Sequence, residues 1–200
     1  MKFFVKNRIL WSRIFVIFIL LLIIFSSYSW SKDSLLYFIM QWFGFVCVVI
    51  ATLGRLWCTI YIGGYKEDTI ITQGPYSIVR NPLYIFSFIG IIGLGSASQN
   101  IIALLLFIIL FTFFYPFVVQ NEENNLEKAH GELFVEYRKK TPKWIPRFSL
   151  YNRPPEYVVH LKNIDEAILS SMWFLWFFLI LKIIEKFQEL TWIPVLFTFP

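Results

Sequence analysis

One stretch of the sequence holds 41 uncharged residues in a row; it runs from Asn81 to Asn121 and reads NPLYIFSFIGIIGLGSASQNIIALLLFIILFTFFYPFVVQN. About 20 apolar residues are enough to cross the hydrocarbon core of a bilayer, so this stretch is too long for one span. Its middle, from Gly95 to Asn100, reads GSASQN and interrupts the apolar run with small and polar residues. The stretch therefore predicts a helical hairpin with membrane spans at about residues 82–98 and 101–119.

Further apolar runs lie on both sides of this hairpin. Residues 14–30 carry no charge and follow four basic residues, which predicts a first span over roughly residues 9–30. A cleaved signal peptide is the alternative, although no clear A-x-A cleavage site is present. Residues 34–54 predict a second span, residues 167–181 predict a shorter fifth span or an interfacial helix, and the apolar tail 192–200 is expected at the membrane surface. We expect an all-α integral membrane protein with about five transmembrane helices.

The composition supports this fold class. Hydrophobic residues make up 58% of the 200 residues and charged residues only 16%. Soluble domains contain about 45–50% apolar and about 25% charged residues, so a disordered chain is excluded and a soluble globular domain is disfavoured. The net charge of +5 is expected to hold loops against anionic lipid rather than to bind nucleic acid. The lipid bilayer is the expected partner.

Basic residues predict the orientation of the spans. Fifteen of the 18 lysines and arginines lie in residues 1–13, 55–80 and 120–166. Lysine and arginine are enriched in cytoplasmic loops, so these three segments are expected to face the cytoplasm. Chemistry that needs a soluble cofactor is therefore expected in the two longer segments.

The first of these segments contains two helix signals. Gly74-Pro75 marks a turn, and Pro82 suits the first turn of the third span with Asn81 as its N-cap. Taken one at a time, these residues favour an ordinary capped membrane helix behind a short loop over a functional site.

The second segment predicts an amphipathic helix from Glu122 to Tyr137. Its apolar residues recur at helical spacing; they are Leu126, Ala129, Leu133, Phe134 and Tyr137. Glu122 lies four residues before Leu126 and shares this stripe, whereas Glu123 is rotated by about 100° away from it. A carboxylate on an apolar face needs a partner. A cationic cofactor, such as a sulfonium or ammonium group, and a salt bridge to Arg80 or Lys66 are both open.

Other kinds of site find little support. The two histidines, His130 and His160, have no H-x-x-x-H or clustered carboxylates around them, so no metal site is expected. The sequence contains no G-x-S-x-G, P-loop or G-x-G-x-x-G motif, so acyl and nucleotide hydrolysis are not indicated.

Two motifs carry a resemblance to a known family. TIITQGPYSIVRNPLY, at residues 69–84, and EENNLEKAHGELFVEY followed by TPKWIP, at residues 122–146, occur in this order with one hairpin between them. Together they resemble the signatures of the isoprenylcysteine carboxyl methyltransferase and phospholipid methyltransferase family. The resemblance covers residues 55–147 and implies an integral membrane enzyme that uses S-adenosylmethionine.

The resemblance also implies a cofactor pocket and a division of the chain. The pocket is expected over the hairpin, facing the cytoplasm. Residues 1–54 would supply the first membrane helices, 55–147 the methyltransferase core, and 148–200 a further membrane helix. The residues that would bind the cofactor are Asp68, Thr69, Ile70, Ile71, Tyr76, Asn81, Pro82, Leu83, Tyr84 and Glu122. No residue is assigned to catalysis itself.

The sequence departs from the family signatures at four positions. Asn81 replaces the histidine of the first motif, Asp68 stands where a histidine often opens it, and His130 replaces a phenylalanine. Val118 stands where the isoprenylcysteine enzymes have an arginine for the substrate. These changes affect the assignment of the cofactor less than they affect the assignment of an isoprenylcysteine substrate.

The expected methyl acceptor is lipid-like or prenylated. Its recognition is expected to rest on apolar contacts from the third and fourth spans, including Phe111, Phe113, Phe114 and Phe117. Two alternatives remain: a membrane enzyme like the sterol reductases, with a nicotinamide cofactor, and a non-catalytic membrane binding protein.

Overall fold

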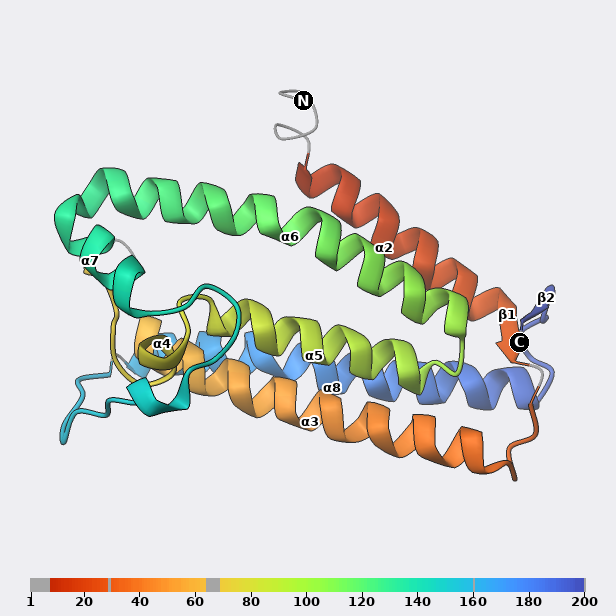
Figure 1. The fold of residues 1–200 in the computed structure, drawn as a ribbon. Coiled ribbons are helices and arrows are strands. Elements are labelled where there is room, and N and C mark those ends of the chain that lie inside the picture. Colours follow the sequence, from red (N-terminus) through yellow and green to blue (C-terminus); the bar gives the residue numbers. More distant parts are fainter. Residues whose placement is uncertain (1–7, 29, 64–68, 160, 200) are drawn as a thin grey trace.

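The computed structural model describes residues 8–28, 30–63, 69–159 and 161–199. Five long helices form an elongated bundle (Figure 1). They are α2 (Arg8–Phe25), α3 (Leu35–Ile62), α5 (Pro82–Ala97), α6 (Ile101–His130) and α8 (Leu161–Glu189). The shorter elements are β1 (Ser26–Tyr28), α4 (Pro75–Ile78), α7 (Glu132–Lys140), the 3-10 helix η1 (Phe148–Leu150) and β2 (Phe197–Phe199).

Within the described residues, three helices are long and apolar enough to cross a membrane: α3, α6 and residues 163–189 of α8. Helix α5 is apolar but has only 16 residues. Large apolar side chains of α3, including Leu35, Phe38 and Leu53, are exposed, as expected for a surface that faces lipid. The all-helical membrane class is thus supported, while the count of five spans stays a prediction.

The predicted hairpin is confirmed: α5 and α6 are joined by residues 98–100. Asn100 caps α6, because its side chain accepts a hydrogen bond from the Ala103 N–H at 2.9 Å. Glycines bring α5 close to α3, since a Cβ at Gly44 would lie 2.7 Å from the Gly93 carbonyl oxygen. Small residues at such crossings let helix backbones approach closely in membranes.

The first span was predicted too long. Helix α2 ends at Phe25, and residues 26–28 form β1 instead of a further helical turn. Strand β1 pairs in parallel with β2, so the apolar tail returns to the end of α2. The Gln188 side chain also donates to the Ser26 carbonyl oxygen at 3.0 Å. These partners come from the other end of the chain, and hydropathy along the sequence does not reveal them.

The predicted helix from Glu122 to Tyr137 was also wrong, because it is interrupted. Gly131 separates α6 from α7 and has a φ of +55°, a conformation that favours glycine. Beyond this break Phe134 is buried, whereas Leu133 is 69% exposed. The apolar residues on the two sides of Gly131 therefore do not share one helical face.

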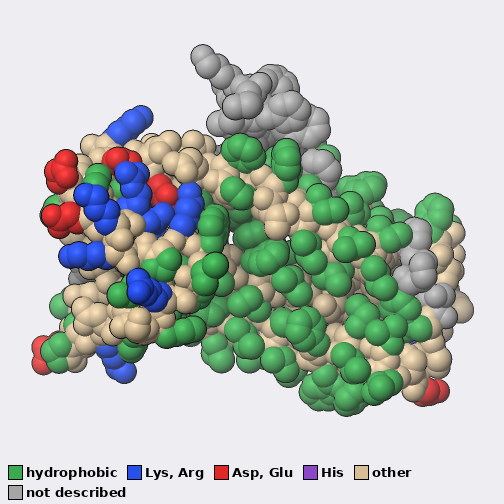
Figure 2. All heavy atoms as spheres, in the orientation of Figure 1, with side chains coloured by type: hydrophobic (Ala, Val, Ile, Leu, Met, Phe, Trp, Pro, Cys, Tyr) green, Lys and Arg blue, Asp and Glu red, His purple; other side chains and the backbone are tan. Residues whose placement is uncertain are grey.

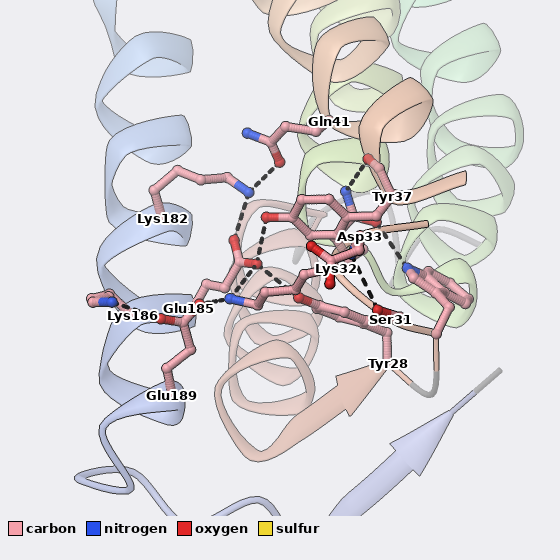
Figure 3. A network of polar contacts seen from close by, with 12 residues as sticks. Tyr28, Ser31, Lys32, Asp33, Tyr37, Gln41, Lys182, Glu185, Lys186 and Glu189 are labelled. Atoms are coloured by element: carbon pink, nitrogen blue, oxygen red, sulfur yellow. Dashed lines mark hydrogen bonds and ion pairs between the residues drawn. The ribbon is translucent and has the colours of Figure 1, made fainter. Parts of the chain in front are cut away.

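Polar side chains gather at the two ends of the bundle. Figure 2 shows lysines, arginines and acidic residues clustered near α4 and α7, beside a largely apolar surface over the middle of that face. At the far end, Figure 3 shows Glu185 accepting hydrogen bonds from Tyr28 at 2.9 Å and Tyr37 at 2.8 Å. Lys182 donates to Glu185 at 2.7 Å and also bonds Gln41. We call the first region the charged end and the second the tyrosine end.

Candidate functional site

The charged end brings the two polar segments together. Residues 74–80 lie against the chain that follows α7, as Figure 1 shows around α4. Three main-chain hydrogen bonds join them: Arg80 N–H to Pro142 O at 2.9 Å, Arg147 N–H to Ile78 O at 2.9 Å, and Gly74 N–H to Asn152 O at 2.8 Å. The residues of both sequence motifs therefore meet at one site.

The turn predicted at Gly74-Pro75 starts α4. Gly74 has a φ of +58°, and a Cβ there would lie 2.4 Å from the Tyr61 ring, so only glycine fits. All residues of α4 are buried. The Tyr137 hydroxyl donates to the Tyr76 carbonyl oxygen at 2.7 Å, and burial raises the pKa of both tyrosines, so both hydroxyls stay protonated. Helix α7 thus fixes α4 in place.

Glu123 is the most enclosed carboxylate of the charged end and is only 5% exposed. Its Oε1 accepts from Arg80 Nε at 3.0 Å and from Asn81 Nδ2 at 3.1 Å. Its Oε2 lies 3.2 Å from Lys143 Nζ. Two cations and an amide satisfy this carboxylate, which makes Glu123 a structural group rather than an open ligand.

Arg80 connects three parts of the site. Besides Glu123, its Nη1 donates to the carbonyl oxygens of Arg138 at 2.8 Å and Thr141 at 3.0 Å. Asn81 precedes α5 as predicted, but its side chain does not cap that helix, because it binds Glu123 and the Lys143 carbonyl oxygen instead. These two residues hold the start of α5 against the end of α6.

Glu122 has a different environment. It is half-buried and accepts a hydrogen bond from the Tyr84 hydroxyl at 2.7 Å. None of the ion pairs found among the described residues involves Glu122. The salt bridge weighed for Glu122 is made by Glu123 to Arg80, and Lys66 lies outside the described residues. Glu122 is the carboxylate that could receive a cationic ligand.

The burial of the two carboxylates is the reverse of the predicted one. Glu122 was predicted on the inward stripe and Glu123 off it, from a stripe that combined Leu126 and Ala129 of α6 with residues of α7 beyond the break at Gly131. Residues of α6 itself give the correct face: Phe111 and Val119 are buried, and steps of four residues lead from them to Glu123. That spacing is the signal that would have found Glu123.

The other predicted cofactor residues differ in their packing and burial. Ile71, Tyr76 and Leu83 pack together in one apolar cluster with the end of α3. Pro82 is fully buried, Thr69 is exposed and Ile70 is half-buried. Asp68 lies outside the described residues. Within the part of the chain that the structure describes, the Tyr76 hydroxyl is buried without a hydrogen-bond partner, so this site contains a polar atom that a ligand could satisfy.

An apolar cavity of about 290 Å³ lies beside this site, between α2, α5, α6 and α8. Tyr115 lines the cavity, and its ring contacts the Tyr84 ring edge-on with centroids 5.4 Å apart. Side-chain contacts therefore lead from the cavity through Tyr115 and Tyr84 to Glu122. Of the four phenylalanines expected to contact an acceptor, Phe111 and Phe114 line the cavity, whereas the other two, Phe113 and Phe117, are 66% and 58% exposed.

Nothing in the described part of the chain forms a metal centre. No group of three or more histidine, cysteine, aspartate or glutamate side chains lies close enough together there to hold an ion. The arrangement fits an organic ligand with a cationic group near Glu122 and a second reactant in the apolar cavity.

Comparison with known proteins adds independent information. A family model described as phospholipid methyltransferase matches residues 34–132. The chain is 32% identical over 199 residues to the nickel-cobalt-cadmium resistance protein NccN of Alcaligenes xylosoxydans xylosoxydans, covering 100% of this chain and 92% of that protein. It is 34% identical to the cobalt-zinc-cadmium resistance protein CzcN of Cupriavidus metallidurans, covering 94% of this chain and 86% of that protein.

A shorter similarity links the chain to a named enzyme. Over 81 residues it is 33% identical to the protein-S-isoprenylcysteine O-methyltransferase of Schizosaccharomyces pombe, which covers 40% of this chain and 34% of that protein. No solved structure matches the chain. The resemblance noted from the two motifs is confirmed.

Proposed function

Because the chain belongs to the phospholipid methyltransferase family, we propose that it is an integral membrane enzyme that transfers a methyl group from S-adenosylmethionine to a lipid-like or prenylated acceptor. The observation that carries the proposal is Glu122, a carboxylate free of ion pairs among the described residues and joined through Tyr84 and Tyr115 to an apolar cavity. A polar binding site next to an apolar cavity suits the meeting of a water-soluble cofactor with a lipid.

The charged end offers suitable groups for the cofactor. The Glu122 carboxylate would hold a cationic part of S-adenosylmethionine, and the unpartnered Tyr76 hydroxyl would donate or accept one hydrogen bond. Asp68, Thr69, Ile70, Ile71, Asn81, Pro82, Leu83 and Tyr84 complete the proposed pocket by their positions in the family motif. Asn81 is already bound to Glu123, so it would act by positioning α5 rather than by exchanging protons.

The proposed reaction needs positioning more than acid–base chemistry. When bound, S-adenosylmethionine would supply a methyl group on a sulfonium: an acceptor atom would attack the methyl carbon in line as the carbon–sulfur bond breaks, and S-adenosylhomocysteine would leave as the neutral thioether. The protein's own part would be to hold the reactive end of the acceptor near Tyr84 and Glu122. Such orientation supplies much of the rate of this kind of step. Aromatic rings of Phe111, Tyr115 and Tyr84 would keep water from this junction.

Binding measurements on the detergent-purified full chain test the cofactor. We expect isothermal titration calorimetry to detect S-adenosylmethionine and not NADPH. Binding of NADPH alone would favour a reductase related to the sterol reductases, and binding of neither would favour a non-catalytic membrane protein. Incubation of membranes with methyl-labelled S-adenosylmethionine then tests the acceptor, because the label should enter the lipid fraction. Label confined to a water-soluble product would contradict the proposed acceptor.

The cofactor site is proposed to face the cytoplasm. The support is the basic residues near α4 and α7 and the positive-inside rule. A cysteine at Lys139, which is exposed at this end, should resist an impermeant thiol reagent in intact cells and react after permeabilisation. A cysteine at Lys32, exposed at the tyrosine end, is the matched control and should react in intact cells. The opposite labelling pattern would invert the orientation.

The two relatives that match the chain almost from end to end suggest where such a reaction would be used. Their names place them in resistance to nickel, cobalt, zinc or cadmium. We propose that methylation by this protein contributes to resistance to such metals. A deletion strain should grow poorly with added cobalt or cadmium and recover with the wild-type gene but not with Glu122→Gln. Recovery with Glu122→Gln would separate the resistance from the methyl transfer.

A further inference from the structure

Arg55 of α3 is a cation inside the helical bundle. Its Nη1 donates to Ser87 Oγ of α5 at 2.5 Å, and its guanidinium carbon lies 5.7 Å from the centroid of the Phe174 ring of α8. None of the ion pairs between described residues includes Arg55, and its Nε is buried without a hydrogen-bond partner. A charged group within membrane helices is costly unless something pairs with it. The described part of the chain therefore supplies no anion for Arg55, and a bound ligand could supply one.

A second unsatisfied group belongs to the same region. Tyr76 is 6% exposed, and its hydroxyl is buried without a hydrogen-bond partner among the described residues. Tyr76 packs in one cluster with Cys58 and Tyr61 of α3, and Cys58 is three residues from Arg55. The two unsatisfied groups therefore lie near the same part of α3. A buried polar atom without a partner needs an explanation, and a bound ligand group is one.

The surroundings of Arg55 also reach the apolar cavity. Phe174, which faces the guanidinium, lines the cavity of about 290 Å³, and so does Tyr115. The remaining lining is apolar and includes Ile91, Phe177 and Leu181. Arg55 is not among the residues that line the cavity, so Phe174 is the contact that connects the two. A ligand that paired with Arg55 and also entered the cavity would have an anionic group at the guanidinium and an apolar chain beside Phe174.

We propose that Arg55 binds the anionic end of the methyl acceptor, and that the acceptor is an amphiphile whose carboxylate or phosphate lies at Arg55 while its apolar chain fills the cavity. This rests on the proposed methyl transfer. Arginine is suited to the role because its planar guanidinium pairs with carboxylates and phosphates through two parallel hydrogen bonds. Val118 stands where the isoprenylcysteine enzymes have an arginine; here helix α3 would supply one from a different direction.

Photo-crosslinking with defined probes tests this inference. The probes are a diazirine-bearing C16 fatty acid, the corresponding fatty alcohol and the corresponding alkyl phosphate, each added to the purified full chain. We expect the wild-type protein to bind the acid or the phosphate at least tenfold more tightly than the alcohol, with crosslinks at Phe177 or Leu181 for all three probes. Comparison of the acid with the phosphate identifies which anion the site prefers.

Variants assign that preference to Arg55. Arg55→Met should abolish the difference between acid and alcohol and leave alcohol binding unchanged, which also shows that the variant is folded. Arg55→Lys should keep a part of the preference, because it retains the charge but not the paired hydrogen bonds. Arg153→Met, at an exposed arginine of the same end, is the control and should behave as the wild type.

Other results would overturn the inference. Equal binding of acid and alcohol to the wild type would show that no anion is recognised in the cavity. A tenfold loss of S-adenosylmethionine affinity in Arg55→Met, with the acid preference intact, would assign Arg55 to the cofactor. If no variant binds S-adenosylmethionine while the Arg55-dependent preference persists, the proposed function fails and the anion site stands.

Discussion

Two carboxylates with several polar partners lie at opposite ends of the bundle, the buried Glu123 at the charged end and the half-buried Glu185 at the tyrosine end. Glu123 is satisfied by two cations and an amide, and Glu185 by Lys182 and two tyrosine hydroxyls (Figure 3). Each network joins helices that are distant in sequence. By their polar contacts alone, the two ends would be equally good candidates for a functional site.

The difference lies in what surrounds each network. At the charged end, Glu122 lacks an ion pair among the described residues, and a cavity of about 290 Å³ lies nearby. At the tyrosine end, Glu185 borders a cavity of about 20 Å³, which has room for about one water molecule. A buried polar network therefore does not by itself indicate a site. The useful signal is an incompletely satisfied group beside a space of ligand size.

The largest change in stability is expected for a substitution that removes the carboxylate at the centre of the tyrosine end. Glu185→Ala leaves the half-buried Lys182 without its carboxylate and removes the acceptor of Tyr28 and Tyr37, so we expect a loss of about 3 kcal/mol in the free energy of unfolding. Denaturant unfolding in detergent, followed by circular dichroism, measures it. The affinity for S-adenosylmethionine of the folded variant should not change. A lowered affinity with unchanged stability would mean that the tyrosine end belongs to the active site.

A smaller stability loss is expected at the charged end. Glu123→Gln keeps hydrogen bonds to Arg80 and Asn81 but removes the charge that pairs with Arg80 and Lys143, which should cost about 2 kcal/mol. The same unfolding experiment measures the change. The affinity for S-adenosylmethionine should fall only if the loss of this network lets α5 and α6 separate. Lys143→Ala removes one of the two cations that pair with Glu123, so it should lower the stability and the affinity less than Glu123→Gln does. This expectation would be contradicted if Glu123→Gln were unstable while Lys143→Ala were stable but inactive.

Glu122→Gln should distinguish a binding group from a structural one. We expect at least a tenfold loss of S-adenosylmethionine affinity, about 1.4 kcal/mol, because the variant keeps the shape and removes the charge. The free energy of unfolding should change by less than about 0.5 kcal/mol, since no ion pair found among the described residues is lost. Calorimetric titration of both glutamate variants compares them directly. Equal and negligible effects on affinity would make Glu122 a structural residue.

The smallest effect is expected where an ion pair is open to water. Arg138 and Glu127 form a contact of 2.7 Å, but their side chains are 40% and 39% exposed. Exposed ion pairs contribute about 0–1 kcal/mol, so Glu127→Gln should change the free energy of unfolding by less than about 0.5 kcal/mol. A loss as large as that of Glu123→Gln would show that burial does not separate the two pairs.

Several features of this protein followed from the sequence by itself. The hairpin from Asn81 to Asn121 is fixed by the length of an uncharged run and by the polar break within it, both of which are local properties. The family followed from two motifs, because they are short strings of residues that can be read in order. The turn at Gly74 was equally readable, since only glycine suits its backbone conformation.

Other features were decided only by the tertiary structure. The break at Gly131 separates the apolar residues of α7 from those of α6, and within α6 Glu123 rather than Glu122 lies on the buried face of Phe111 and Val119. The strand pairing that ends α2, and the meeting of Arg55 with Ser87 and Phe174, join residues that are far apart along the chain. Spacing along a helix tells which residues share a face. It does not tell what that face meets, because burial and charge pairing depend on partners that arrive from other helices.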